Sequence, residues 1–195
     1  MNFTKKFNQD FVVYKNLRLP WQKVLADLNV WKDDHSFSCS IVDERNSEKI
    51  LNQKLNVQSQ DYNHYGYNSH NTKIWKTTNK KNKLTFDWED ELCNQLPLIH
   101  PIATVTRQDP GQILPWHKDE FFFHKKNYNF NGEIWRFLVF LEDWKVGHHL
   151  FVESSVLTHW KQGDVIVWKP ESMHLAGNSG LEPKWTCNVT GFWNE

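Results

Sequence analysis

The sequence predicts a mainly β protein whose strands form an antiparallel sandwich or barrel. From residue 101 onward, the chain consists of short runs rich in β-branched and aromatic residues. Turn-forming sequences (DPGQ, KVGH, KQGD, KPES, GNSGLEP) separate these runs at a spacing of roughly 8–12 residues, which favours antiparallel strands over alternating strand–helix units. We expect strands at 102–107, 134–142, 149–153, 156–160, 164–168 and 184–193. The C-terminal half is therefore predicted to be a β-roll, whose mouth can hold a metal and a ligand.

The first hundred residues are expected to support this roll. Two short helices are predicted, at 21–28 and at 87–96, and the second begins with Asp87 as an N-cap candidate. Residues 52–83 are polar and poor in aliphatic side chains, which predicts a long surface loop. A chain of 195 residues suits one domain with a substantial core. We expect a single domain at 1–195, with an α/β support at 1–100 and the roll at 101–195.

Composition excludes several classes of protein. Lys+Arg and Asp+Glu number 23 each, and this balance argues against a nucleic-acid binder, because such proteins usually carry a basic excess. Cys39, Cys93 and Cys187 are far apart and form no C-x-x-C pair, so neither disulfides nor a structural zinc site is expected. No signal-peptide core and no run of about 18 apolar residues is present. We expect a cytoplasmic protein without a membrane partner. No pattern indicates its oligomeric state.

His117, Asp119 and His174 are the candidate metal ligands. His117 and Asp119 follow the DPGQ turn and are expected to begin a strand, in which residues i and i+2 point to one face. His174 follows a strand and its turn, and in a closed roll this segment can return beside His117. Two imidazoles and one carboxylate would form the facial triad of non-haem Fe(II) oxygenases. Two other roles stay open: Asp119 could cap the turn, and His174 could be a hydrogen-bonded wall residue.

His148 and His149 are weaker candidates as a pair of ligands. Adjacent residues in a strand point to opposite faces, so the two imidazoles would not converge on one ion.

Three stretches resemble known oxygenases. RQDPGQILPWHKD, at 107–119, is similar to the R-Y-x-P-G-Q-x-x-x-P-H-x-D stretch of prolyl-4-hydroxylase-type Fe(II)/2-oxoglutarate oxygenases. WRFLVFLEDW and THWKQGDVIVWKPESMHLAGNSGLEPKWTCNVTGFW resemble the matching parts of aspartyl/asparaginyl β-hydroxylases. The resemblance covers about 102–193 and implies a double-stranded β-helix, a jelly-roll or cupin-like fold, with a few N-terminal helices.

The resemblance assigns roles to individual residues. It implies that His117, Asp119 and His174 hold iron. It places Lys184, ten residues after His174, where the family has the arginine that pairs with the distal carboxylate of 2-oxoglutarate, and Thr186 where a hydroxyl often assists. Lysine for arginine is a departure, because a point charge replaces a planar fork and bidentate pairing is lost.

Arg136 matches the strand arginine of the β-hydroxylases and is expected to contact the cosubstrate or an acidic substrate. Because it lies among residues expected to be buried, it needs a partner. Gln108 stands where the prolyl hydroxylases carry a tyrosine, which puts a cosubstrate contact at that position in doubt. Trp116, Trp168, Trp185 and Phe121 to Phe123 are expected either to line the pocket or to pack in the core.

The implied activity is that of a dioxygenase with Fe(II), 2-oxoglutarate and O2 as cofactor and cosubstrates. It would form succinate and CO2 while hydroxylating an amino-acid or peptide side chain. Two alternatives stay open. One is a cupin with another activity or none, because Gly163, Pro170, His174 and Asn178 nearly fit the second cupin motif, although the first motif is missing. The other is a carbohydrate- or peptide-binding jelly roll, which the 11 tryptophans would suit.

Part of the segment 52–83 is expected to fold over the metal mouth as a lid. It carries Tyr62, Tyr65, Tyr67 and Trp75, which a purely solvated connector seldom needs. Loops at the mouth of a roll commonly exclude water from a reactive centre.

Overall fold

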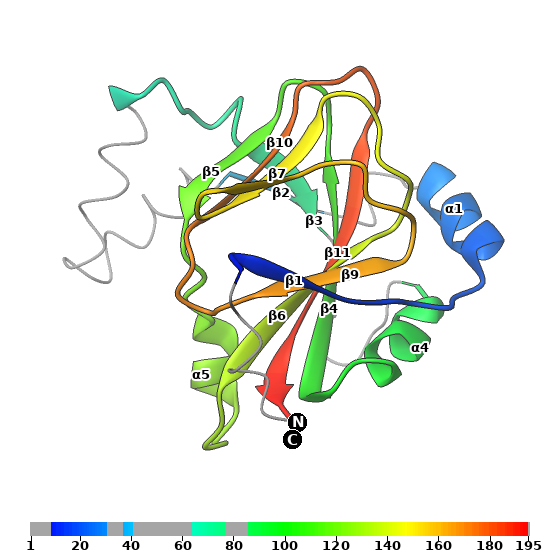
Figure 1. Cartoon of the computed structure of the whole chain (residues 1–195), viewed down its shortest axis with the longest axis vertical. Helices are drawn as coiled ribbons and strands as arrows, with labels where there is room; N and C mark the ends of the chain where they lie inside the picture. Colours follow the sequence, from blue (N-terminus) through cyan, green and yellow to red (C-terminus); the bar gives the residue numbers. More distant parts are fainter. Residues whose placement is uncertain (1–8, 31–36, 41–63, 77–85, 195) are drawn as a thin grey trace.

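The structure is a computed structural model that describes residues 9–30, 37–40, 64–76 and 86–194. Within these residues the chain forms three helices and eleven strands, ordered as in Figure 1. The helices are α1 (Trp21–Asn29), α4 (Trp88–Asn94) and α5 (Phe122–Asn127). The strands are β1 (Phe11–Asn16), β2 (Phe37–Ser40), β3 (Lys73–Lys76), β4 (Leu98–Gln108), β5 (Ile113–His117), β6 (Ile134–Phe140), β7 (His148–Val152), β8 (Ser155–Leu157), β9 (Asp164–Trp168), β10 (His174–Asn178) and β11 (Lys184–Trp193).

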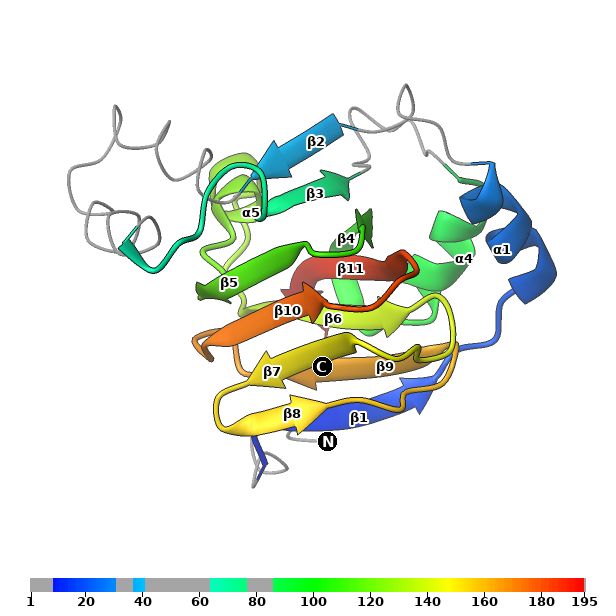
Figure 2. The ribbon, with the colours of Figure 1, turned by 90° about the horizontal axis from the view of Figure 1, so that it is seen from above.

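The strands form two antiparallel sheets. The larger has the order β1-β9-β6-β11-β4-β3-β2, and the smaller has the order β5-β10-β7-β8. From β4 to β11 the chain passes back and forth between the sheets, so that most neighbours in this part of each sheet are remote in sequence, and the hairpin of β7 and β8 is the exception. Figure 2 shows the small sheet stacked over β4, β11, β6 and β9. This topology is a double-stranded β-helix, which confirms the predicted fold class.

Alternation along β6 explains why the large sheet is buried on both faces. Side chains of a strand point alternately to opposite faces. Phe137 and Val139 pack in a cluster with residues of α1 and α4, whereas Leu138 and Phe140 pack in a second cluster with residues of the small sheet. All four are at most 5% exposed. The two helices therefore cover the outer face, and the space between the sheets is free to hold a site.

The N-terminal elements extend and cover the roll. β1 pairs with β9 at one edge of the large sheet, and β3 pairs with β4 near the other. The strand β3 lies inside the segment 52–83 that was expected to be a loop, so that expectation is wrong for 73–76. The lid expectation for 52–63 and 77–83, including Tyr62, lies outside the described residues.

Local structure differs from the sequence prediction at three further places. Asp87 makes no capping hydrogen bond and instead pairs with Lys23 at 2.8 Å. The strand predicted at 156–160 ends at Leu157, because His159 has a φ of 58° that a strand cannot accommodate. The aromatic run after Asp119 forms α5, where no helix was predicted. Its two exposed phenylalanines, Phe122 and Phe123, gave no helical hydrophobic pattern.

Two findings concern the cysteines and the helices. Cys93 and Cys187 are buried free thiols. None of the helices in the described part of the chain is long and apolar enough to cross a membrane.

Candidate metal centre

His117 and His174 come from neighbouring strands of the small sheet. His117 is the last residue of β5 and His174 is the first of β10, and the antiparallel register places them opposite each other. Opposite residues in antiparallel strands point to one face, with Cβ atoms about 4.5–5.5 Å apart. The two ring centroids accordingly lie 4.2 Å apart. Pairing of strands that are remote in sequence is what brings the two imidazoles together.

Backbone carbonyls orient both rings. Nδ1 of His117 lies 2.7 Å from the carbonyl oxygen of Pro115, and Nδ1 of His174 lies 3.1 Å from that of Ser172. A carbonyl oxygen can only accept, so each Nδ1 carries the proton and donates it. Each Nε2 therefore keeps its lone pair, which is the usual arrangement of a metal-binding histidine.

Asp119 supplies the third donor from the loop after β5. The sequence predicts a strand that begins at His117 and continues through Asp119, but the structure ends β5 at His117. Asp119 Oδ1 accepts a hydrogen bond from Nη1 of Arg136 on β6. Its Oδ2 is buried without a hydrogen-bond partner and lies 3.7 Å from Nε2 of His174. A buried carboxylate oxygen without a donor requires an explanation, and a cation held among these side chains provides one.

The three side chains form a metal-sized cluster. Their candidate ligand atoms all lie within 4.8 Å of one another. In the part of the chain that the structure describes, this is the one group of three or more potential ligands that meets such a distance. The structure thus brings together the three residues that the sequence proposed as ligands, although only the two histidines stand on strands.

Electrostatics leave the cluster ready for a cation at neutral pH. Desolvation lowers the pKa of His117 to about 3 and also lowers the pKa of His174, so both rings are neutral. Burial acts to raise the pKa of Asp119, but the positive charge of Arg136 opposes this effect, and the pKa of this carboxyl is lowered. Two neutral imidazoles and one carboxylate are the protonation states that metal binding needs.

The cluster faces a cavity of about 230 Å³ between the two sheets. Its walls combine apolar and polar side chains. The apolar ones include Ile74, Leu114, Leu138, Leu150, Trp168 and Ala176, and the polar ones include Lys76, Thr106, Gln108, Arg136, Lys184, Thr186 and Asn188. All six residues that the sequence proposed for the site (His117, Asp119, Arg136, His174, Lys184 and Thr186) line this one cavity.

Lys184 is a buried cation in the cavity wall. It is 2% exposed, and its Nζ donates to the carbonyl oxygens of His149 at 2.8 Å and Gly177 at 3.4 Å. Burial lowers its pKa to about 7. Nearby, the hydroxyl oxygens of Thr186 and Thr106 lie 2.6 Å apart. An ammonium group has three donors, so beside its two carbonyl contacts Lys184 keeps one donor that can bind a carboxylate.

Arg136 lines the cavity and pairs with one of the candidate ligands. Its guanidinium pairs with Asp119, its Nε donates to Thr190 Oγ1 at 3.2 Å, and it lies 5.5 Å from the centroid of the Phe121 ring. The partner that a half-buried arginine needs is therefore the candidate metal ligand. Its present contacts orient that carboxylate.

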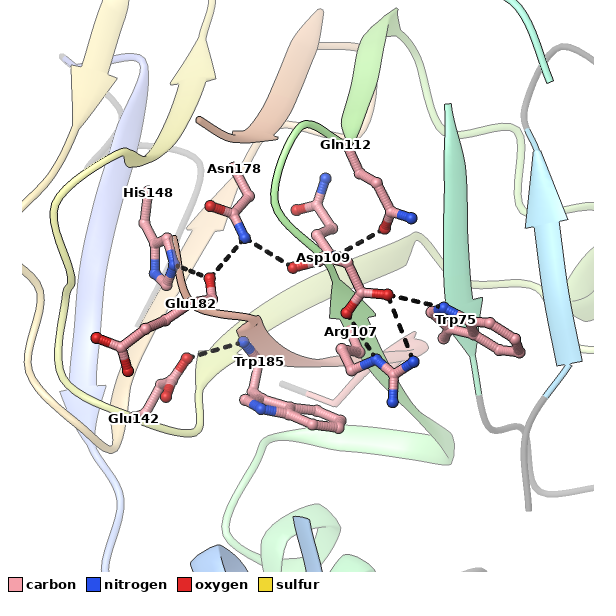
Figure 3. Close-up of polar contacts among 10 residues, drawn as sticks. Trp75, Arg107, Asp109, Gln112, Glu142, His148, Asn178, Glu182 and Trp185 are labelled. Carbon is pink, nitrogen blue, oxygen red and sulfur yellow. Dashed lines mark hydrogen bonds and ion pairs between the residues drawn. The ribbon is translucent and has the colours of Figure 1, made fainter. Parts of the chain in front are cut away.

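A polar network lies at the ends of β5 and β10 that are remote from the histidines (Figure 3). Asn178, at the end of β10, donates to the backbone oxygens of Gln108 at 2.9 Å and Glu182 at 2.8 Å. In the turn before β5, Asp109 accepts from Trp75 Nε1 at 3.0 Å. These contacts link the end of β10 with the end of β4, and β3 with the turn before β5.

Several cavity residues were not singled out from the sequence. Ile74 and Lys76 come from β3, and Asn188 comes from β11. A strand of four residues is too short to show a reliable alternation of apolar and polar side chains. The stretch KIWK also lies in a polar segment, and the sequence pattern therefore did not predict this strand. For Asn188, the signal was present: it lies an even number of residues from Lys184 and Thr186, and therefore on their face of the strand.

The aromatic expectations hold in part. Of the proposed pocket residues, Phe121, Phe122 and Trp168 line the cavity, whereas Trp116, Phe123 and Trp185 do not. His148 and His149, set aside as a ligand pair, also lie outside the metal cluster. Nε2 of His148 is 3.0 Å from the carbonyl oxygen of Glu182, and Nδ1 of His149 is 3.2 Å from that of Gly147.

Comparison with known proteins finds similarity in structure alone. No family model and no curated protein sequence matches the chain. AviO1 from Streptomyces viridochromogenes Tue57 is similar with a TM-score of 0.49 and 15% identity, over 95% of this chain and 91% of that one. A prolyl-4-hydroxylase from Pseudomonas putida has a TM-score of 0.46 and 13% identity, over 90% and 99%. A predicted oxalate decarboxylase from Thermotoga maritima has 0.39 and 12%, over 62% and 81%.

Proposed function

We propose that the protein is a non-haem Fe(II)/2-oxoglutarate-dependent dioxygenase that hydroxylates an amino-acid or peptide side chain. The observation that carries this proposal is the convergence of two proton-free Nε2 atoms and the unpartnered Oδ2 of Asp119 on one point of a buried cavity. Two imidazoles and one carboxylate are the donor set of the non-haem Fe(II) oxygenases.

The donor set is not that of a structural zinc site. No thiol lies among the residues that line the cavity in the described structure, and structural zinc sites favour thiolates. Three protein donors leave room on a six-coordinate ion for a bidentate cosubstrate and for O2. When bound there, Fe(II) with 2-oxoglutarate supplies the oxidative decarboxylation that yields succinate and CO2.

The chain's own groups have distinct tasks in this proposal. The carbonyl oxygens of Pro115 and Ser172 hold the rings of His117 and His174 with Nε2 toward the ion. Lys184 is positioned to bind the distal carboxylate of 2-oxoglutarate, with the hydroxyl of Thr186 as a second donor. Desolvation around Lys184 strengthens such a charge pair because the local dielectric constant is low.

The apolar part of the wall excludes water from the reacting centre. Leu138 and Leu150 are at most 5% exposed, and Trp168 packs its ring 4.8 Å from that of His174. Such a wall prevents side reactions of a strong oxidant. The substrate class follows from the resemblance to enzymes that act on amino-acid and peptide side chains.

The test compares wild type with His174→Ala under anaerobic conditions. We expect wild type to bind one Fe(II) or Mn(II) per chain without O2, and to form succinate from 2-oxoglutarate once O2 is admitted to the Fe(II) form. The variant should lose both while keeping its circular dichroism spectrum. His148→Ala is the matched control, because His148 is also buried and hydrogen-bonded to a carbonyl but lies outside the cluster. Ligand binding by wild type without any metal, and with no succinate formed, would instead favour a binding module.

A further inference from the structure

A second cavity, of about 590 Å³, lies beside the metal cavity. Five of its thirteen lining residues are aromatic, namely Phe121, Tyr128, Phe130, Trp135 and Phe192. Trp135 and Phe192 are 3% and 2% exposed, so they are fixed by packing, whereas Phe130 is 40% exposed. Such a site offers rigid apolar surfaces together with an open side.

The charges on its lining balance. Lys125 and Lys169 contribute two positive charges, and Glu133 and Glu171 contribute two negative ones. Glu133 also accepts a hydrogen bond from Trp135 Nε1 at 3.1 Å. An occupant therefore gains mainly from contact with aromatic faces and has no need of a net charge.

Three chain segments form a common wall between the two cavities. Phe121 lines both. On β6, Ile134 and Trp135 line the second cavity and Arg136 lines the metal cavity. At the end of β9, Trp168 lines the metal cavity while 169–171 line the second. Phe121 therefore stands between the two cavities, and a substrate that occupied both would pass this residue.

The volumes indicate why a substrate would need both. Pockets that enclose a ligand of moderate size hold about 300–1,000 Å³. The metal cavity, at about 230 Å³, is below this range and must also take 2-oxoglutarate, whereas the second cavity, at about 590 Å³, is within it. The reacting carbon can reach the metal cavity, but the rest of a substrate cannot be enclosed there.

Phe121 has a backbone conformation that supports a role in this wall. Its φ is 54°, a left-handed conformation that is rare for a bulky residue. Such strain is maintained where the surroundings over-determine it, often at ligand-binding positions. Here the ring lies beneath the guanidinium of Arg136, which links the shared wall to the residue that holds Asp119.

We infer that the second cavity is a substrate subsite that binds an uncharged aromatic group of the substrate, remote from the C–H bond that is oxidised. The inference rests on the proposed function and specifies its substrate class: an amino-acid or peptide substrate that carries an aromatic side chain near the reacting residue. Aromatic recognition would then determine which side chain is presented to the metal.

The test uses N-acetyl-L-phenylalaninamide as the probe and N-acetyl-L-alaninamide as its matched control. Binding is followed by amide chemical shifts of metal-free protein, because the subsite itself contains no metal ligand. We expect the phenylalanine probe to shift the amides of Gly132 and Ile134, and the alanine probe to leave them unchanged.

Two variants then alter the subsite. Gly132→Leu adds bulk at an exposed position, where even a Cβ would come within 2.7 Å of the Phe130 ring, and Phe130→Ala removes a ring from the wall. Both should weaken probe binding about tenfold or more, with Mn(II) and 2-oxoglutarate affinities unchanged. Val146→Phe, at a 79% exposed position outside both cavities, should bind the probe as wild type does.

The outcomes separate the two proposals. With wild type, phenylalanine-containing blocked dipeptides should stimulate succinate formation more than alanine-containing ones, and Gly132→Leu should lose this preference. Absent shifts at Gly132 and Ile134, or equal probe affinity in wild type and Gly132→Leu, would overturn the subsite while leaving the oxygenase proposal intact. A wild type that binds no metal would overturn the oxygenase proposal, and with it the substrate assignment.

Discussion

Arg136 shows how a residue's role depends on its partner. Sequence similarity indicates that it could contact the cosubstrate or an acidic substrate, and the structure adds an ion pair with Asp119. One oxygen of Asp119 is thereby occupied, and the other is turned toward His174. Contacts outside the ligand set commonly fix the orientation of metal ligands in this way.

We expect Arg136→Ala to lower Mn(II) affinity about 10–100-fold, the usual effect of removing a group that orients a ligand. At saturating Mn(II), the affinity for 2-oxoglutarate should stay close to that of wild type, because Lys184 is intact. Isothermal titration of each ligand measures both. Arg107→Ala is the control, because Arg107 also pairs with an aspartate but lies outside the cavity lining. Normal Mn(II) binding with loss of 2-oxoglutarate binding would instead make Arg136 the anchor.

Lys184 predicts a pH dependence of cosubstrate binding. Its pKa is about 7 in the folded protein, against an ordinary value of 10.5, because it is desolvated. A bound carboxylate favours the charged lysine, so above pH 7 binding must take up a proton. We expect 2-oxoglutarate affinity to fall as pH rises from 7 to 8.5, by up to about tenfold per pH unit. Titrations in buffers of different ionisation enthalpy measure the proton uptake. The Lys184→Met variant should bind 2-oxoglutarate weakly, and its affinity should not change with pH in this range.

The lowered pKa of Lys184 also makes the free energy of unfolding depend on pH. Between pH 7 and 10.5 the unfolded chain holds the lysine proton more often than the folded chain does, so the free energy of unfolding rises with pH across this window. The cost of burying a charged lysine is fully present below pH 7 and disappears toward pH 10.5. Relative to Lys184→Met, wild type should therefore gain stability as pH rises. A difference that stays constant with pH would contradict the low pKa.

Residue types and spacing predicted much of the site. The H-x-D pair and the distant histidine were sufficient to propose the ligands, because few side chains bind metals. Partners were harder to predict, since Arg136 meets Asp119 only through packing of β6 against the loop after β5. Ile74 and Lys76 were missed because their strand has only four residues.

At the scale of elements, the pairing of β5 with β10 assembles the metal centre. Asn178 ends β10 and holds two backbone oxygens, those of Gln108 and Glu182. It is 2% exposed, so water cannot replace its amide without rearrangement. The sequence identified Asn178 only as part of a near-match to a cupin motif, and its structural task was not predictable from that pattern.

We expect Asn178→Ala to lower the free energy of unfolding by about 1–3 kcal/mol, because it leaves buried acceptors without donors. Mn(II) affinity should fall less than in His174→Ala, since the ligands remain but their strands are held less firmly. Urea unfolding and Mn(II) titration measure the two effects. Asn127→Ala, which removes an exposed amide donor to Phe123, should change stability by less than about 0.5 kcal/mol. Equal losses in both variants would contradict a special role for Asn178.

The strand β3 revises the role of the polar segment before α4. The segment was expected to be a surface loop with a lid, and 73–76 instead extend the large sheet while Ile74 and Lys76 line the metal cavity. A deletion that includes 73–76 would therefore remove part of the cavity wall. The substitution Lys76→Ala alters one side chain of this wall and leaves the β3 backbone in place.

At the scale of the whole molecule, the predicted strands were sufficient to indicate two antiparallel layers. Turn sequences marked most strand ends, and alternation along β6 agreed with burial on both faces. The order of strands within each sheet was not predictable from these local patterns, because it depends on which distant strands pair. The resemblance to known oxygenases implied a double-stranded β-helix without naming the strand order, and the structure confirms this fold.

Ligand binding at the centre should stabilise the whole fold, because both sheets contribute to the cavity. His117 and His174 come from the small sheet, while Arg136 and Lys184 come from the large one. A ligand that binds only the folded state at about 100 times its Kd adds about 2.7 kcal/mol. For a chain of 195 residues, this corresponds to a rise in Tm of about 5–10 °C. We expect this rise with Mn(II) and 2-oxoglutarate together in differential scanning calorimetry, and its reversal by a chelator. His174→Ala should show no rise, and Lys184→Met should retain the part due to Mn(II) alone. An equal rise in wild type and His174→Ala would place the ion elsewhere on the molecule.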